Sequence, residues 1–391
     1  MKEFKNIVAE FDRVKGEQQM ALATVVKVRG SSYRSPGARM LIRKDGRWTG
    51  SISGGCLEGD ALRKARKVMQ SELPTLVTYD TMDDHNNSLG VGLGCNGIID
   101  VLIEPITKQN NPIDRLRTFT NFDDITGMAT IYASQNDKAI VGQQLWFNQS
   151  GEVESTLTDE RLEQLLATGL SDVLQNKKPA VKQYSVEKLE VFYELIEPSI
   201  DLIIFGGGFD AKPVTEMASA LGWDVTVTDE CIAHVAPAAF PAANVSFCKR
   251  EDFNSDITIK PYSAAVLMSH TFDYDLAALR MLLKTDVNYI GILGPKKRMD
   301  KMFTALEEAG TEITKNDRDR IHSPIGIDIG AETPEEIALS IVSEIQAKFT
   351  NRSGGFLKYR KAPIHKRDGK EDQVFKQVFI NAQSDKNQSN A

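Results

Sequence analysis

Hydrophobic residues in the first half of the chain follow two periods in turn. Spacings of three and four residues, which place side chains on one face of a helix, predict helices over 4–11, 57–69 and 160–174. Continuous or alternating apolar runs predict strands over 21–28, 40–43, 47–49, 76–79, 98–104, 127–133, 139–147 and 191–196. Asp45-Gly46 suits the positive φ of a hairpin turn between two of these strands. The pattern therefore predicts a mixed α+β unit.

The pattern changes near Glu197-Pro198-Ser199, and beyond it short apolar strands alternate with helices. Strands are expected over 202–205, 224–228, 264–268 and 289–293, and helices over 211–221, 276–283 and after Pro295. Thr333-Pro334-Glu335-Glu336 combines a capping box with proline at the first helical position, which predicts a further helix to Phe349. Such alternation is typical of a parallel, Rossmann-like sheet. We therefore expect an α/β chain with domains over 1–198 and 199–350 and a polar, mobile tail over 351–391.

Composition narrows the class of protein. The 391 residues are 41% hydrophobic and 26% charged, which is ordinary for a globular chain with more than one core. A net charge of −7 argues against nucleic acid as the main partner. The sequence has no apolar run as long as a membrane span needs, and its first residues lack the apolar core of a signal peptide. Four cysteines without close pairs fit neither a zinc site nor a disulfide framework, so we expect a cytoplasmic protein.

Two of the cysteines follow glycines in predicted turns. Ser53-Gly54-Gly55-Cys56 immediately precedes a predicted helix, whose dipole would stabilise a thiolate on Cys56. Cys95 lies among glycines 90, 92, 94 and 97. The alternative for a single cysteine is a small buried hydrophobic residue, which describes Cys231 and Cys248 well. The repeated glycine–cysteine setting favours a functional role for Cys56, and for Cys95 the two readings remain balanced.

A polar loop precedes the first of these motifs. The segment GSSYRSPGAR spans residues 30–39 and supplies hydroxyl groups, two guanidinium groups and flexible backbone, with candidate ligands Gly30, Ser31, Ser32, Arg34 and Arg39. Hydroxyls, backbone N–H groups and guanidinium groups together suit a phosphate or another oxyanion. An ordinary polar loop would have a similar composition.

The second half of the chain carries a glycine motif between a predicted strand and helix. Gly206, Gly208 and Ala211 fit the pattern G-x-G-x-x-A, and Asp229 ends the second strand where a ribose-binding carboxylate belongs. Asp210 inside the turn opposes a pyrophosphate, so a Rossmann-like domain without a nucleotide is an equal alternative.

Two further candidates follow later strands of the same predicted sheet. Lys296, Lys297 and Arg298 open a helix, where they would bind an anion or form a solvated basic surface. His270 follows another strand, either at the same ligand site or as a hydrogen-bonded loop residue.

Several of these segments together resemble the XdhC/CoxI family, the maturation factors of molybdenum hydroxylases such as xanthine dehydrogenase. The similar segments run in family order over about residues 20 to 348 and read GSSYRSPGARML, DGRWTGSISGGCLE, GLGCNG, DLIIFGGGFDAKP, YIGILGPKKR and SPIGIDIGAETPEEIALSI. The chain departs from the family pattern at Phe209, where histidine is common.

The resemblance implies a function. Family members bind molybdenum cofactor, protect it while its terminal sulfido ligand is installed, and deliver it to the apo-enzyme. The implied partners are a molybdenum hydroxylase apo-enzyme, a cysteine desulfurase and a second copy of the chain in a homodimer. Molybdopterin carries a phosphate, which would suit the loop with Ser31, Ser32, Arg34 and Arg39. Cys56 would then face molybdenum or a transferred sulfur.

Two alternatives stay open at this point. The glycine motif and Asp229 also fit an NAD-dependent oxidoreductase, and the adjacent acid Glu230 would disfavour NADP. Within the chaperone interpretation, Cys56 or Cys95 would carry a persulfide on the way to molybdenum.

Overall fold

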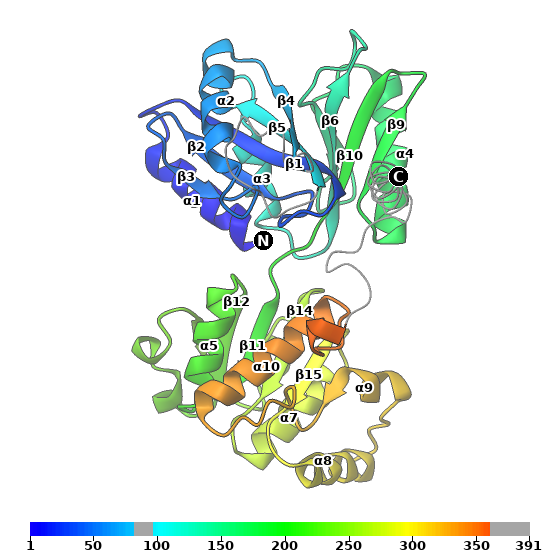
Figure 1. The fold of residues 1–391 in the computed structure, drawn as a ribbon. Coiled ribbons are helices and arrows are strands. Elements are labelled where there is room, and N and C mark those ends of the chain that lie inside the picture. The colour runs from blue at the N-terminus through cyan, green and yellow to red at the C-terminus, as the bar shows by residue number, and fades with distance from the viewer. Residues whose placement is uncertain (82–96, 360–391) are drawn as a thin grey trace, which may run out of the picture. The chain divides into compact units, whose positions relative to one another are not determined.

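The structure is a computed structural model that describes residues 1–81 and 97–359. The chain divides into two compact units, Glu3–Glu197 and Pro198–Tyr359, and Figure 1 shows the elements of each. Within the described ranges, no helix is both long and apolar enough to cross a membrane.

The N-terminal unit contains two antiparallel sheets of five strands each. The first has the order β3 (Trp48–Gly50), β2 (Arg39–Arg43), β1 (Met20–Gly30), β5 (Gly97–Pro105) and β4 (Thr75–Asp80). The second has the order β8 (Val153–Ser155), β7 (Gln144–Phe147), β6 (Thr126–Ser134), β10 (Leu189–Ile196) and β9 (Ala180–Tyr184). The two central strands of each sheet, β1 with β5 and β6 with β10, carry most of the buried positions.

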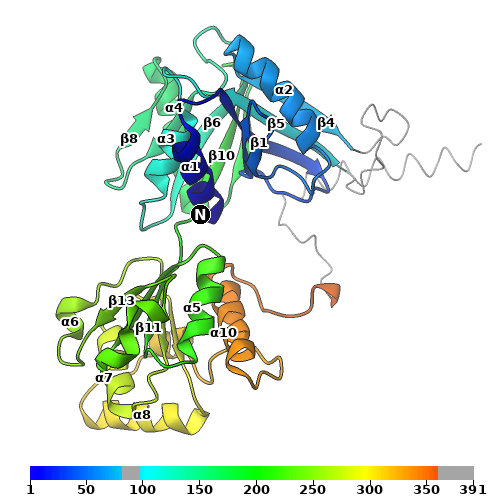
Figure 2. The same ribbon diagram turned by 90° about the vertical axis from the view of Figure 1, so that its left-hand side faces the viewer.

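In the described part of this unit, four helices cover the sheets: α1 (Lys2–Val14), α2 (Glu58–Ser71), α3 (Pro112–Phe119) and α4 (Glu160–Asn176). Helix α2 buries Ala61, Ala65 and Val68 against the first sheet, and α4 packs on the second. Figure 2 shows α2 along the first sheet, and Figure 1 shows α4 beside β9 of the second. The sheets themselves meet through a small buried cluster, in which Val26 of β1 lies with Phe192 of β10. The N-terminal unit is therefore one packed body around several cores.

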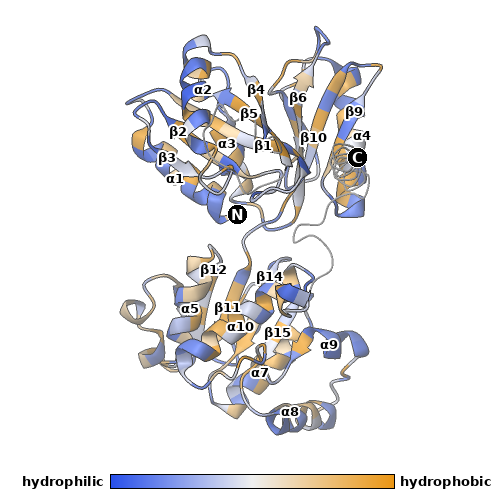
Figure 3. Ribbon diagram, viewed as in Figure 1, coloured by the Kyte–Doolittle hydropathy of each residue, from blue (hydrophilic) through white to orange (hydrophobic). Residues whose placement is uncertain are grey.

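The C-terminal unit is a six-stranded parallel sheet. Its order is β13 (Asn244–Phe247), β12 (Asp224–Asp229), β11 (Asp201–Phe205), β14 (Ser263–Leu267), β15 (Tyr289–Ile292) and β16 (Ile321–His322). The helices are α5 (Ala211–Ala220), α6 (Phe253–Asp256), α7 (Phe272–Leu282), α8 (Lys296–Glu308), α9 (Lys315–Arg320) and α10 (Pro334–Phe349), with short 3₁₀ turns η1 (Ile232–Val235), η2 (Pro237–Ala239) and η3 (Leu357–Tyr359). Figure 3 shows hydrophobic colour along β11 and β15 and mostly hydrophilic colour along α8. This strand order places the switch point, where ligands gather in such sheets, between β11 and β14.

The expected fold class is confirmed, with local differences. The strand predicted over 139–147 is limited to β7, because Gly142 turns the chain with φ of 92° just before it. Helix α3 was not predicted, although Asn111 caps it and Pro112 opens it. Strand β16 was also missed, since two residues show no period.

Candidate functional site

The predicted polar loop and the Cys56 loop lie at the same end of the first sheet. Strands β2 and β3 are antiparallel and pair Met40 with Gly50, so the loop before β2 and the loop after β3 emerge together. The ring of Tyr33 lies over Gly54, where a Cβ atom would come 3.5 Å from the ring carbon Cγ. The structure therefore brings residues 31–38 into contact with residues 51–57.

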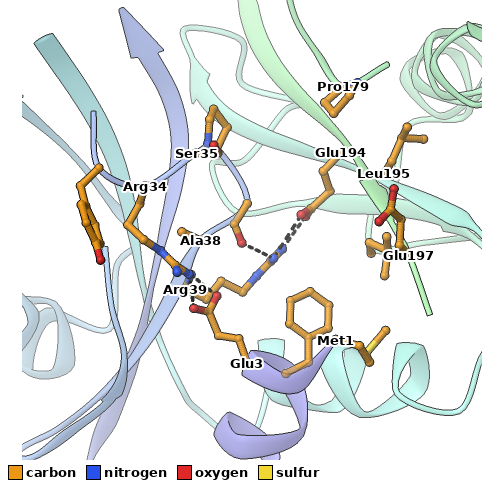
Figure 4. Close-up of a pocket in the computed structure, with 15 residues that line it drawn as sticks. Met1, Glu3, Arg34, Ser35, Ala38, Arg39, Pro179, Glu194, Leu195 and Glu197 are labelled. Atoms are coloured by element: carbon orange, nitrogen blue, oxygen red, sulfur yellow. Dashed lines mark hydrogen bonds and ion pairs between the residues drawn. The ribbon is translucent and has the colours of Figure 1, made fainter. Parts of the chain in front are cut away.

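An open pocket of about 490 Å³ adjoins the first loop. Its walls come from the loop itself, from Glu3 and Phe4 of α1, and from the end of β10. Figure 4 shows Arg34 and Arg39 entering this pocket from the same side. Both predicted arginines thus line one cavity, but their surroundings differ.

Arg39 is committed to internal partners. Its side chain is only 2% exposed and forms a two-pronged ion pair with Glu194 of β10, whose side chain is 6% exposed. It also donates to the carbonyl oxygen of Gly37 at 2.8 Å and lies 4.7 Å from the centre of the Phe4 ring. Arg39 therefore links the two sheets and holds the end of the loop.

Arg34 is more accessible. Its side chain is 31% exposed and pairs with Glu3 of α1. The Nε atom is buried and has no hydrogen-bond partner in the described part of the chain. An incoming anion would compete with Glu3 for hydrogen bonds from this guanidinium group.

The Cys56 loop is organised by one serine. Ser53 Oγ accepts hydrogen bonds from the amides of Gly55 and Leu57, both at 3.1 Å, and lies 3.6 Å from Cys56 Sγ. Cys56 itself is half-buried, and the adjoining Gly54 and Gly55 are exposed. Gly55 has φ of 111°, which favours glycine at this turn. The thiol is thus half-buried on a fixed backbone, where it packs against the hydrophobic core of the first sheet.

A buried carboxylate completes this loop. Glu58 is 3% exposed, and its oxygens accept from the amides of Ser53 at 2.9 Å and Leu57 at 3.1 Å and from the Ser53 hydroxyl. The amide of Ile52 adds a longer contact at 3.3 Å. Sequence reasoning missed Glu58, because a five-residue spacing from Ser53 matches no familiar capping pattern.

The remaining N-terminal candidates have mixed placements. Gly30 ends β1, Ser31 is exposed, and Ser32 is buried with a hydroxyl that has no partner among the described residues. Cys95 lies outside the described residues. Residues 1–81 and 97–359 contain no cluster of three or more histidine, cysteine or acidic side chains that would hold a metal ion.

Residues of the C-terminal unit itself bond and cover its glycine turn. Asp229 accepts from the amide of Gly207 at 2.9 Å and that of Cys231 at 2.8 Å, and it lies 3.1 Å from His234 Nδ1. The His234 carbonyl oxygen would lie 2.2 Å from a Cβ atom on Gly207. In dinucleotide-binding proteins, the pyrophosphate approaches the backbone at the second glycine of the motif. That glycine is Gly208 here, and a Cβ atom on it would lie 2.7 Å from Asp210 Oδ1. A carboxyl group of the turn itself therefore lies beside the glycine that a pyrophosphate would approach.

The other C-terminal candidates lie along the carboxyl edge of the sheet. His270 follows β14, has φ of 62°, and its Nε2 lies 2.8 Å from a carboxylate oxygen of Asp210 in the glycine turn. Arg298 of α8 bonds Asp275 at 2.7 Å, and Asp275 also accepts from the Ser269 hydroxyl at 2.6 Å. Burial raises the pKa of the Asp275 carboxyl despite these partners. The predicted residues Gly206, Gly208, Ala211 and Lys296 lie in the turn or at the starts of α5 and α8.

Known proteins match both units. The family described as XdhC Rossmann domain matches residues 202–345, and the XdhC and CoxI family matches residues 14–80. A probable subunit of xanthine dehydrogenase from Bacillus subtilis (strain 168) is 31% identical over 332 residues, covering 84% of this chain and 93% of that protein. The molybdenum cofactor insertion chaperone PaoD of Escherichia coli (strain K12) is 22% identical over 324 residues, covering 83% and 81%. A crystal structure of a xanthine dehydrogenase from Bacillus halodurans superposes with a TM-score of 0.70 at 29% identity, covering 91% of this chain and 98% of that one.

Proposed function

The chain belongs to the XdhC and CoxI family, and from that premise we propose that it binds molybdenum cofactor, supports its sulfuration and delivers it to a xanthine dehydrogenase-type hydroxylase. The observation that carries this proposal is the contact between the Arg34 loop and the Cys56 loop through Tyr33 and Gly54. This contact brings a partly exposed guanidinium group and a thiol to one end of one sheet. The name of the relative PaoD supports the same class of function.

The two loops suit the two chemical ends of the cargo. Molybdopterin carries a phosphate and a metal held by sulfur. The phosphate would replace Glu3 as the partner of Arg34, whose ion pair is partly exposed to solvent. The Cys56 thiol would face the metal, since thiolate sulfur is a good ligand for soft metal centres. Arg39 would act indirectly, by holding the loop through Gly37.

Replacing Cys56 by alanine should remove most of the molybdopterin that copurifies with the protein. We expect a similar loss, about tenfold, for Arg34→Met, since a hydrogen bond to a charged group is worth about that factor. The measurement is the fluorescence of oxidised pterin released from equal amounts of protein. Cys231→Ser, which changes an exposed thiol in the C-terminal unit, is the matched control. If the unaltered protein neither carries nor accepts molybdopterin, the proposal fails.

Support for sulfuration would take the form of a persulfide on a loop cysteine. The Cys56 thiolate attacks the outer sulfur of a persulfide on a cysteine desulfurase, forms a new S–S bond and releases the desulfurase thiolate. Mass spectrometry after incubation with the desulfurase and free cysteine should show one added sulfur atom on the Cys56 peptide. Unmodified Cys56, with sulfur found on Cys95 or on neither, would reject this route.

We expect no NADH binding by the C-terminal unit. The side chain of Asp210 lies beside Gly208, where a pyrophosphate would approach, and Asp229 is already bonded to the turn, so neither the pyrophosphate nor the ribose has its usual site. Titration of the protein with NADH to millimolar concentration should leave nicotinamide fluorescence unchanged. A saturable change would restore the oxidoreductase alternative.

A further inference from the structure

We propose that Glu58 makes the Cys56 loop selective for cationic or neutral groups and closes it to anions. A helix N-terminus with exposed amides normally attracts anions. At α2 that role is already taken by a carboxylate from within the helix, because Glu58 accepts from the amides of Ser53 and Leu57 and from the Ser53 hydroxyl. Each of these groups donates to Glu58, so the amides of Ser53 and Leu57 are already occupied.

The carboxylate lies close to the thiol. Cys56 Sγ is 3.6 Å from Ser53 Oγ, and that oxygen is bonded directly to Glu58. The sulfur and the carboxylate are therefore separated by a single hydroxyl group. A second acid in the same helix turn, Asp60, is balanced by Arg63 at 2.8 Å and Lys64 at 3.0 Å, whereas the partners of Glu58 are neutral. Among the described residues, no positively charged side chain pairs with Glu58, so its carboxylate gives the loop a negative charge close to Cys56.

Glu58 also fixes the backbone that carries the thiol. It bonds residues on both sides of Gly54 and Gly55, which are themselves exposed and lack side chains. Without these bonds the two glycines would allow many loop conformations. Glu58 is therefore a positioning residue as well as a source of charge.

For the cargo, this consequence rests on the proposed function. A ligand with an anionic phosphate and a metal centre would be oriented by the two loops. The phosphate is repelled from the Cys56 loop and attracted by Arg34, so the metal end is the one that meets the thiol. The opposite charges of the two loops would therefore determine the orientation of the bound cofactor.

The test measures which charged reagents reach Cys56. In a protein with Cys95→Ser, Cys231→Ser and Cys248→Ala, Cys56 is the only thiol, and it is reacted with a trimethylammonium methanethiosulfonate and with a sulfonate methanethiosulfonate. The ratio of the two rates is divided by the ratio for 2-mercaptoethanol. We expect a value of about 10 in favour of the cation, because the Glu58 carboxylate attracts the cationic reagent and repels the anionic one. Glu58→Gln should bring the value to about 1.

Two further variants separate charge from position. Asp60→Asn removes a negative charge from the same turn, but Arg63 and Lys64 already pair with that charge. The ratio of rates should therefore stay near that of the unaltered loop. Glu58→Asp keeps the charge but shortens the side chain, so both rates should rise while the ratio persists. An unchanged ratio in Glu58→Gln, or an equal fall in Asp60→Asn, would overturn the inference. Since no cofactor is used, either result is independent of whether molybdopterin binds.

Discussion

Replacing Arg39 by methionine should lower the free energy of unfolding by about 3–5 kcal/mol. The two side chains of the Arg39–Glu194 pair are 2% and 6% exposed, so the variant leaves Glu194 as a buried, unpaired charge. It also removes the hydrogen bond to the Gly37 carbonyl and the contact with the Phe4 ring. Urea unfolding of both proteins at neutral pH, followed by circular dichroism, measures the difference.

Two comparisons isolate the buried pair. Arg63→Met removes a guanidinium group of the same unit that is 66% exposed, and it should change stability by about 0.5 kcal/mol or less. Arg39→Met combined with Glu194→Leu removes both charges and should recover most of the loss. If Arg39→Met were as stable as Arg63→Met, the ion pair would not be the link between the sheets that its geometry indicates.

The structural role of Arg39 decides which arginine variant can test anion binding at the candidate site. A variant of Arg39 would lose bound cofactor even if the guanidinium never touches it, because the loop before β2 would lose its anchor at Gly37. Within residues 1–81 and 97–359, the one ion pair of Arg34 is with the partly exposed Glu3, and its side chain bonds no loop carbonyl. Arg34→Met is therefore the variant that reports on anion binding, and its stability should be measured alongside.

Local signals in the sequence predicted local structure well. Asp45-Gly46 turns the hairpin between β2 and β3, with Gly46 at φ of 100°. Thr333 and Glu336 form the capping box at the start of α10, each accepting from the backbone of the other. The strand–turn–helix context of Gly206 to Ala211 is also present. In each case the residues that determine the structure are neighbours in the chain.

The features that decide the chemistry are not local. Arg39 and Glu194 are separated by 155 residues, and no pattern in either segment names the other as its partner. The same holds for the glycine turn, because a G-x-G-x-x-A match does not reveal that Asp229 will already be bonded to the amide of Gly207. Sequence patterns predict which polar groups could bind a ligand. The packing of distant segments determines which of these groups are already bonded within the protein.

Glu104 provides the second large effect, on the pH dependence of stability. It lies on β5 and is 1% exposed, and its Oε1 has no hydrogen-bond partner in the described ranges. Burial raises the pKa of this carboxyl from 4.5 to about 7, although Arg115 and Arg39 act in the opposite direction. A folded-state pKa above the unfolded one means that stability is full below about pH 4.5 and falls as pH rises to about 7. The loss at pH 8 should be about 3 kcal/mol.

Glu104→Gln should therefore become more stable relative to the unaltered protein as pH rises, by about 3 kcal/mol between pH 4 and pH 8. Urea unfolding at several pH values measures this difference. Glu190→Gln is the opposite control: burial raises the pKa of Glu190, but hydrogen bonds from Tyr132 and Lys27 and nearby positive charge outweigh it and lower the pKa overall. Its ionisation stabilises the fold, so that variant should lose relative stability as pH rises through the acid range. Parallel pH profiles for Glu104→Gln and the unaltered protein would contradict the argument, because burial would then not disfavour the charged form of this carboxyl.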